Sequence, residues 1–234
     1  MNAPRTITLF RSPARPCSYL PGREAVNEWA DPAAVDARVY DRLIELGFRR
    51  SGSHVYRPGC SDCARCISMR VDVQRFRPAR RDRRCLNANA DLSLHWAEPG
   101  YSAAHFALYR RYLAARHPHG GMDNPTPEGF RQFLIGDWSR TRFLEMRRDG
   151  KLLAVAVTDE VRDGLSAVYS FFDPDESRRG LGNFAVLSQI RLACEAGLRW
   201  LYLGYWIESS SKMAYKGRFR PAEGFIEGHW RPLP

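Results

Sequence analysis

Apolar residues recur every three or four positions in several stretches of the chain, which predicts amphipathic helices. The first helix should begin at Asp31-Pro32, where Asp caps the helix and Pro suits its first position, and end at Gly47. Its apolar side is formed by Val35, Val39, Leu43 and Leu46. The same spacing predicts helices over residues 101–116, from about Thr126 onward, and over 182–196. A loop rich in proline and glycine, residues 117–127, separates the second helix from the third.

Runs of apolar and β-branched residues between these helices predict strands. Two pairs of runs read as hairpins, one with a Ser-Gly-Ser turn at residues 51–53 and one with Asp149-Gly150 between residues 142–148 and 151–161. Further strands are predicted over residues 66–73, 165–172, 198–206 and 225–230. Residues 74–85 read as an arginine-rich connector.

The order of these elements predicts an α+β protein. Two helices, three antiparallel strands, a helix and a further strand follow one another, which indicates a mixed, mainly antiparallel sheet flanked by helices. The character of the chain changes before the second helix. We therefore expect a small N-terminal domain with a cysteine cluster, residues 1–95, and a C-terminal domain, residues 96–234.

The charge balance points to a polyanionic partner. The chain has 36 basic and 26 acidic residues, for a formal net charge of +10, and this favours nucleic acid ahead of a membrane surface. Neither a secretory leader nor an apolar run long enough to span a membrane is evident, so we expect a soluble, cytoplasmic protein. In that reducing compartment the six cysteines are not expected to form disulfides.

Three of the cysteines form two overlapping C-x-x-C units, Cys60, Cys63 and Cys66. This spacing suits a soft metal centre, zinc or an iron–sulfur cluster. The fourth ligand would be Cys17, His54 or Cys85. The alternative is that all three are small, buried residues at the end of a hairpin.

Arginines are dense between residues 65 and 84. They are Arg65, Arg70, Arg75, Arg77, Arg80, Arg81, Arg83 and Arg84. Most charge runs are solvated surfaces, but this one has only Asp72 and Asp82 to balance it. We favour contact with nucleic acid phosphates.

The segment "DPDESRRGLG" leads into the helix predicted over 182–196. Arg178 and Arg179 precede Gly180 and Gly182, and glycines at a helix N-terminus let backbone N–H groups approach an anion. This segment resembles the pyrophosphate loop of the GNAT acyltransferases, although Ser177 stands where that loop has Arg or Gln. A glycine-rich helix cap is the alternative. With the strands around it, the segment favours a GNAT-like sheet, in which the acyl donor binds where two strands separate.

Aromatic and cationic residues alternate after the last long strand, from Gly204 to Pro221. The notable ones are Tyr205, Trp206, Lys212, Tyr215 and Lys216. Rings stack on bases and cations bind phosphates, so this segment suits the floor of a nucleic acid groove. Otherwise it is a surface loop on an aromatic core.

Four segments together resemble the aminoacyl-tRNA–protein transferases. They are "CSYLPG", "YDRLIELGFRRSGSHVYRPGCSDCARCISMRV", "FFDPDESRRGLG" and "WLYLGYWIESSSKMAYKGRFRP". The length and the "CSYLPG" start are similar to the short bacterial leucyltransferases. The resemblance implies transfer of leucine from leucyl-tRNA to proteins with N-terminal Asp or Glu, which marks them for degradation as N-degrons. No cofactor is implied for the transfer itself, and the fold implied is a small domain before a GNAT-like domain.

The resemblance also suggests roles for residues. The base candidates are Asp173, Asp175 and Glu208; the acidic N-terminus would meet Arg178, Arg179, Lys212 or Lys216; and Tyr205, Trp206 and Tyr215 would stack on the terminal adenosine or shape the leucine pocket. Gly180 and Gly182 would lie against the donor. In the eukaryotic relatives N-terminal cysteines are associated with metal or iron–sulfur binding, which leaves Cys17 with Cys60, Cys63 and Cys66 as a four-thiolate set.

Three other functions stay open at this point. Arginyl-tRNA is an alternative donor, favoured if an acidic residue lines the aminoacyl pocket, whereas an apolar lining favours leucine. A tRNA- or RNA-binding regulator with an inactive GNAT-like domain is a second alternative. An N-acetyltransferase that uses acetyl-CoA is the third.

Overall fold

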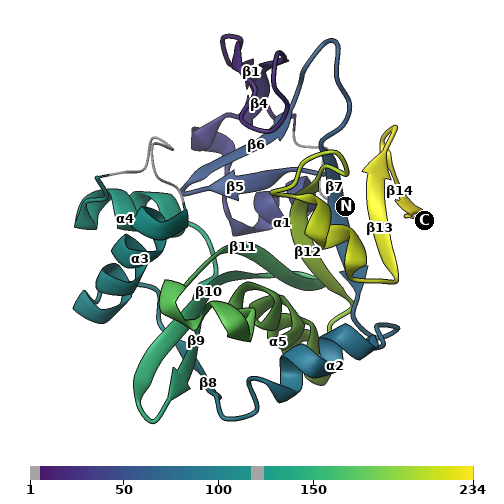
Figure 1. Cartoon of the computed structure of the whole chain (residues 1–234). Coiled ribbons are helices and arrows are strands. Elements are labelled where there is room, and N and C mark those ends of the chain that lie inside the picture. The colour runs from purple at the N-terminus through teal and green to yellow at the C-terminus, as the bar shows by residue number, and fades with distance from the viewer. Residues whose placement is uncertain (1–5, 117–123, 234) are drawn as a thin grey trace.

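The computed structural model describes residues 6–116 and 124–233, so most of the predicted loop over 117–127 lies outside the described residues. Its centre is an eight-stranded sheet with the order β14-β13-β7-β12-β11-β10-β9-β8 (Figure 1). The strands are β7 (Ile67–Asp72), β8 (Ser93–Ala97), β9 (Thr141–Arg148), β10 (Lys151–Val161), β11 (Gly164–Phe172), β12 (Trp200–Trp206), β13 (Ala222–Ile226) and β14 (His229–Pro232). Within this sheet β11 and β12 are parallel, and all the other neighbours are antiparallel. The predicted mixed, mainly antiparallel sheet is confirmed.

Two smaller sheets come from the N-terminal part of the chain. One has the order β1-β4-β6-β5, and the other pairs β2 with β3. Their bounds are β1 (Leu9–Arg11), β2 (Arg15–Pro16), β3 (Glu24–Ala25), β4 (Asn27–Ala30), β5 (Arg49–Ser51) and β6 (His54–Pro58). The next strand along the chain, β7, belongs to neither of these sheets and pairs with β12 and β13. The N-terminal part of the chain thus supplies an inner strand of the large sheet.

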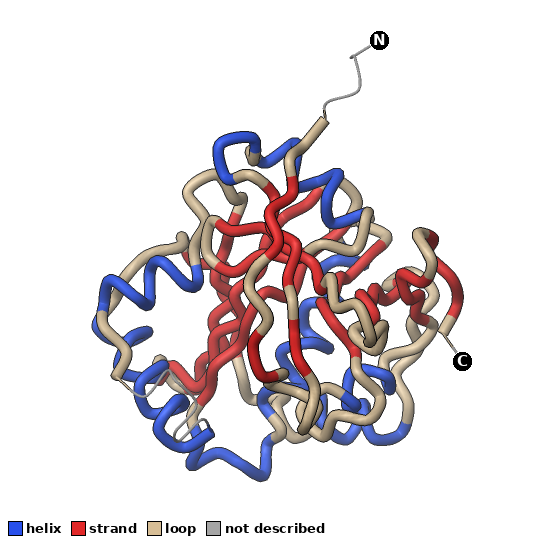
Figure 2. Tube along the Cα trace, turned by 90° about the horizontal axis from the view of Figure 1, so that it is seen from above, coloured by secondary structure: helices blue, strands red, loops and turns tan. Residues whose placement is uncertain are grey.

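Helices cover both faces of the large sheet. Successive side chains of a strand point to opposite faces, and in these strands the side chains on both faces are apolar. Trp200 and Tyr202 of β12 pack with α1 (Ala37–Glu45), whereas Leu201 and Leu203 pack with α5 (Leu181–Glu195). In β10, odd-numbered valines pack with α3 (Ala103–Arg116) and α4 (Pro127–Leu134), and even-numbered alanines pack with α5. Helix α2 (Arg80–Asn87) lies beside α5, and Figure 2 shows the strands in the middle with helices outside.

The start of the first helix differs from the prediction. Asp31 caps only a short 3-10 turn, η1 (Pro32–Ala34), because Val35 is extended with φ −91° and ψ 121°. Helix α1 then starts anew, and the Asp36 carboxylate accepts a hydrogen bond of 2.7 Å from the Val39 N–H. A β-branched residue between two Asp caps thus divides the predicted helix. The predicted end is confirmed, since Gly47 has φ +82°.

Two further segments differ from the sequence-based expectation. The arginine-rich connector contains α2, which is stabilised at its start by a 3.0 Å hydrogen bond from the Ala79 N–H to Asp82. The last predicted strand is a hairpin, because Glu227 and Gly228 both have positive φ. The same type of turn is confirmed at Asp149-Gly150, with φ +48° and +81°.

A buried ion pair joins the small β5–β6 hairpin to the large sheet. The Arg50 side chain is fully buried and donates to Asp159 at 2.5 and 2.6 Å. It also donates to the Thr141 hydroxyl at 2.9 Å. None of the described helices combines the length and apolar character needed to cross a membrane.

Candidate active site

Strands β11 and β12 separate after a short parallel contact. They pair only through Gly164–Ser166 and Trp200–Tyr202, while β11 continues beside β10 and β12 continues beside β7. We call the region between residues 167–172 of β11 and 203–206 of β12 the splay. Ligands of α/β sheets commonly bind outside the carboxyl ends of parallel strands, so the splay is the first place to look for a site.

A glycine makes room for a cation in the splay. Gly204 has φ +68° at a register shift in β12, and a Cβ there would lie 3.0 Å from Nη1 of Arg49. The Arg49 Nη2 donates to the Val168 carbonyl at 3.1 Å, and its guanidinium lies 5.8 Å from the Tyr205 ring centre. Arg49 therefore lies between the two strands and binds the backbone of β11.

A second cation binds the other strand. Lys216 comes from η3 (Ala214–Arg218), is 7% exposed, and donates from Nζ to the carbonyls of Leu203 at 2.8 Å and Tyr205 at 2.9 Å. Burial and, to a smaller extent, the nearby charge of Arg49 together lower the pKa of Lys216 to about 7. The two cations thus satisfy carbonyl groups that strand pairing leaves free where β11 and β12 part.

These cations lack the partners that arginine and lysine usually have. Within residues 6–116 and 124–233, neither Arg49 nor Lys216 forms an ion pair with a carboxylate. Tyr215 lies close by, with 44% of its surface exposed. Burial raises its pKa, although Arg49 and Arg218 lower it. The splay therefore offers positive charge and an accessible ring to a ligand carrying negative charge.

The loop before α5 is built on two glycines that have different tasks. Gly180 has φ +64° at the N-cap of α5, where no side chain caps the helix. Gly182 lies so close to Phe172 that a Cβ would be 3.1 Å from its ring. Together they bring the N-terminus of α5 against the end of β11, at the same end of the sheet as the splay.

The two arginines of this loop are used differently. In η2 (Pro174–Arg179), Arg178 is exposed. Arg179 is ion-paired with Asp91 at 2.7 Å and Glu176 at 2.9 Å. The hydrogen bonds that Arg179 donates to the Asp91 carboxylate raise the pKa of Arg179 above its ordinary value. Arg179 therefore binds the loop to the chain, and only Arg178 is free to meet solvent or substrate.

Two of the three predicted carboxylates, Asp173 and Asp175, meet at one arginine. Asp173 is 1% exposed and binds Arg111 at 2.8 Å. Burial raises its pKa, but the Asp175 N–H and Arg111 lower it by more, so the net pKa is below the ordinary value. Asp175 is largely exposed and also binds Arg111, at 2.8 Å. Glu208 is exposed after the end of β12.

The predicted aromatic residues divide into buried and accessible ones. Tyr205 is 3% exposed, and its hydroxyl donates to the Tyr56 carbonyl at 3.0 Å. Trp206 is also buried, and the backbone of Gly217 packs closely against its indole. Lys212 is exposed. Of the predicted rings, Tyr215 is the one accessible from the splay.

The predicted cysteine cluster is present as four free thiols, but it does not fit a metal site in this structure. Cys17, Cys60, Cys63 and Cys66 are all half-buried. Burial and then the nearness of the other three raise the pKa of Cys66 to about 12, which reflects how close together the four thiols lie. In the described parts of the chain, no group of three or more His, Cys, Asp or Glu side chains is arranged to hold a metal ion.

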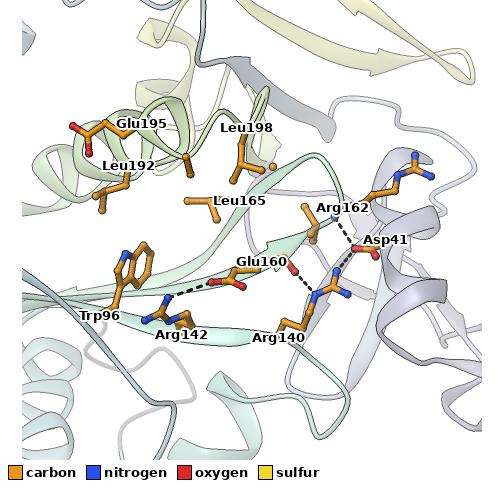
Figure 3. A pocket seen from close by; sticks show the side chains of 13 residues that line it. Asp41, Trp96, Arg140, Arg142, Glu160, Arg162, Leu165, Leu192, Glu195 and Leu198 are labelled. Atoms are coloured by element: carbon orange, nitrogen blue, oxygen red, sulfur yellow. Dashed lines mark hydrogen bonds and ion pairs between the residues drawn. The ribbon is translucent and has the colours of Figure 1, made fainter.

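A cavity lies at the opposite end of β11 (Figure 3). It has a volume of about 690 Å³ and is lined by Gly164, Leu165 and the C-terminal end of α5. Its charged side chains are each ion-paired with a described residue: Arg140 with Asp41, Arg142 with Glu160, Arg162 with Glu45, and Glu195 with Arg191. None of the residues predicted from the sequence lines it. The splay, and not this cavity, is therefore the candidate site.

Arg49 was missed by sequence reasoning. Its signal in the sequence is the pair Arg49-Arg50 inside a predicted strand. Because neighbouring side chains of a strand point to opposite sides, such a pair must place one arginine on each side. A glycine within the strand run "LYLGYW" was the second signal, since a strand glycine marks a bulge or a close approach.

Comparison with known proteins supports the resemblance seen in the sequence. Residues 15–84 match the family described as "Arginine-tRNA-protein transferase, N terminus", and residues 104–226 match "Arginine-tRNA-protein transferase, C terminus". Among solved structures, that of L-PGS from Bacillus licheniformis is similar, with a TM-score of 0.46 and 11% identity. The match covers 60% of this chain and 45% of that chain.

Relatives similar over nearly their whole length carry one name, "Aspartate/glutamate leucyltransferase". The protein from Nitrosococcus oceani is 49% identical over 227 residues, which cover 96% of this chain and 95% of that protein. The protein from Stenotrophomonas maltophilia is 48% identical over 96% of this chain and 92% of its own length. The protein from Hahella chejuensis is 44% identical over 97% of both chains. The chain therefore belongs to the arginine-tRNA–protein transferase family.

Proposed function

We propose that this chain transfers leucine from leucyl-tRNA to proteins that begin with Asp or Glu, and so creates a degradation signal. The observation that carries this proposal is the 49% identity, over 96% of the chain, to an aspartate/glutamate leucyltransferase. The other two relatives described above have the same name. Arginyl-tRNA is not favoured as the donor. Leucyl-tRNA is used in the cytoplasm, and we expect the protein to act there.

The arrangement around the splay supports a GNAT-like reaction site. Three antiparallel strands, the glycine loop, α5 and the parallel strand β12 follow the order expected for that fold. We place the aminoacylated 3′ end of the tRNA at the splay, near Gly180 at the uncapped start of α5. Tyr215 is the accessible ring on which the terminal adenosine would stack.

The reaction joins two bound substrates directly. The α-amine of the acceptor attacks the carbonyl carbon of the leucyl ester, an amide bond forms, and the ester bond to the tRNA 3′-terminal ribose breaks. The ribose hydroxyl leaves with a proton, and the attacking nitrogen loses one. Holding amine and ester together contributes much of the rate. Asp175 and Glu208 stay as base candidates, whereas the lowered pKa of Asp173 makes it a poor one.

No cofactor is needed in this scheme, because the aminoacyl ester is already activated. Zinc or an iron–sulfur cluster at Cys17, Cys60, Cys63 and Cys66 remains a prediction of the sequence alone. Metal analysis of the anaerobically purified protein tests it. Zinc or iron at one equivalent would support the prediction, and the absence of both would leave the four thiols as structural residues.

Arg49 is our candidate for recognising the acidic side chain of the acceptor. It uses one N–H on the Val168 carbonyl, lies beside Lys216, and has no carboxylate partner among the described residues. A guanidinium binds a carboxylate through two parallel hydrogen bonds, which fits Asp and Glu but not their amides. Of the cations predicted from the sequence, Arg178 and Lys212 are exposed and stay candidates for contact with either substrate.

One transfer assay separates the competing functions. Purified protein is given labelled leucyl-tRNA, arginyl-tRNA or acetyl-CoA together with peptides that start with Asp, Glu, Arg or Lys. The proposal predicts label only from leucyl-tRNA and only on Asp and Glu peptides. Label from arginyl-tRNA or acetyl-CoA alone would replace the proposed donor. Retained tRNA binding without transfer from any donor would indicate the RNA-binding alternative.

A further inference from the structure

Helix α2 has one buried side and one arginine side. Asp82 and Asn89 are each 1% exposed, and Cys85 and Leu86 pack against the core beside α5. Asp82, Cys85 and Leu86 are three or four residues apart and form one side of the helix, and Asn89 lies just beyond its end. The opposite side carries four exposed arginines: Arg80, Arg81, Arg83 and Arg84.

The arginines of α2 have no carboxylate partners in the parts of the chain that the structure describes. Arg81 and Arg83 donate only to backbone carbonyls. The acid of the helix, Asp82, is turned inward and paired with Arg218 at 2.9 Å. Some exposed arginines on other helices are balanced, as in Arg131–Glu128 and Arg191–Glu195. The solvent side of α2 is therefore an uncompensated positive surface.

Helix α2 and the turn after it contact both segments that flank the splay. At its C-terminal end, Asn89 donates to the Arg179 carbonyl at 2.9 Å, next to the glycine loop of α5. In its middle, Asp82 holds Arg218 of η3, the element that also carries Lys216. Figure 1 shows α2 running along the edge of the molecule beside α5. Helix α2 therefore lies next to the elements that border the splay.

We propose that the solvent side of α2 binds the phosphate backbone of the acceptor stem of the donor tRNA, next to the 3′ end that reacts. This inference rests on the proposed aminoacyl-tRNA donor. Arginines bind phosphates through charge-assisted, bidentate hydrogen bonds. Contacts of this kind position a duplex without reading its sequence. The splay and α2 thus divide the work between the reacting end and the stem.

Two matched double variants test the proposal. Arg80 and Arg84 are replaced by Gln in one, and Arg38 and Arg42 in the other. Each pair is four residues apart and exposed on a helix, but α1 covers the opposite face of the sheet from α2. Binding is measured with an RNA minihelix that has an acceptor stem and a CCA end, between about 50 and 200 mM salt. Transfer is measured from that minihelix and from the CCA trinucleotide, both leucylated.

The α2 variant should bind the minihelix roughly tenfold more weakly, and its plot of log Kd against log salt should be shallower by about 2. Transfer from leucyl-CCA should stay within about twofold of the unmodified protein, because that donor has no stem to bind. The α1 variant should change neither value. Circular dichroism and thermal unfolding confirm that both variants are folded.

Other outcomes overturn the proposal in distinguishable ways. Equal weakening in both variants would show an effect of net charge, and unchanged binding in the α2 variant would remove α2 from the interface. Loss of transfer from leucyl-CCA in a folded α2 variant would place α2 in the reaction site. Weaker binding only to phosphatidylglycerol vesicles would indicate a membrane surface instead. If the unmodified protein transfers from neither donor but α2 still governs minihelix binding, the proposed function fails and the RNA surface stands.

Discussion

Two neighbouring arginines of one hairpin end in regions of opposite character. Arg50 is fully buried and paired with Asp159 at 2.5 Å, so it joins the small sheet to the large one. Arg49 points into the splay, where it binds a backbone carbonyl at 3.1 Å and no carboxylate of the described chain. Because successive strand residues face opposite sides, the same short strand serves both regions.

The difference teaches where to look for function in this fold. A buried cation is stable when the chain supplies its anion, as Asp159 does for Arg50. A cation without such a partner, held by backbone carbonyls alone, can accept an anion from outside. The cavity at the other end of β11 follows the first pattern, since its Arg140 and Arg142 are both ion-paired.

The largest effect on stability is expected from replacing Arg50, the buried arginine of the pair. Arg50→Met leaves Asp159 buried without its cation, and we expect unfolding to become easier by about 3–5 kcal/mol in urea denaturation. Arg57→Gln is the matched control, because Arg57 lies on the same hairpin in a partly exposed pair with Glu28. The control should lose about 1 kcal/mol or less. Equal losses in both would contradict the structural role of Arg50.

Replacing Arg49 should have the opposite pattern of effects, with a large loss of leucyl transfer and a small loss of stability. Arg49→Gln removes a charged hydrogen bond to the acceptor, worth about 1.5–3 kcal/mol, so kcat/KM for leucyl transfer to an Asp peptide should fall roughly tenfold to hundredfold. The free energy of unfolding should change by about 1 kcal/mol or less, because no buried anion loses its partner. A large loss of stability with unchanged transfer would show that Arg49 has a structural role and does not bind the acceptor.

The lowered pKa of Lys216 leads us to expect that the stability of the protein depends on pH. Its pKa is about 7 in the folded protein and near 10.5 in the unfolded chain. Between these values the unfolded chain binds more protons, so the free energy of unfolding should rise with pH. Compared with Lys216→Met, the unmodified protein should gain about 2 kcal/mol between about pH 7 and 8.5. Urea titrations at both pH values measure this difference, and a constant difference would mean that the Lys216 pKa is not lowered.

The smallest effect is expected from a change in the cavity at the other end of β11, whose charged side chains are ion-paired. Arg142→Gln breaks an ion pair of 3.5 Å with Glu160, and exposed pairs contribute at most about 1 kcal/mol. Leucyl transfer should stay within about twofold of the unmodified protein in the same assay. A tenfold loss of transfer would show that the cavity, and not only the splay, belongs to the reaction site.

Local patterns made much of the fold predictable. Helical spacing gave α3, α4 and α5, and Asp149-Gly150 gave the hairpin of β9 and β10. The sheet order around β7 was not accessible in this way, because its pairing with β12 and β13 joins segments far apart in the chain. The division of the first helix depended on which of two Asp residues caps it, and propensity does not decide between them.

The site was less predictable than the fold, because its chemistry depends on which way side chains point. Tyr205 was expected to stack on a ligand, yet its hydroxyl binds the Tyr56 carbonyl inside the protein. Arg179 was a candidate for substrate binding, and the structure pairs it with Asp91 and Glu176. A sequence shows that a cation is present but not whether a carboxylate from a distant segment meets it.

The central claim is that Arg49 in the splay reads the acidic side chain of the acceptor during leucyl transfer. The most direct test is the ratio of kcat/KM for a peptide that begins with Asp to that for the same peptide beginning with Asn. Leucyl-tRNA is the donor, and the unmodified protein is compared with Arg49→Gln. The account predicts a strong preference for Asp in the unmodified protein and a ratio at least about tenfold smaller in the variant. An unchanged ratio in a folded, active variant would contradict it.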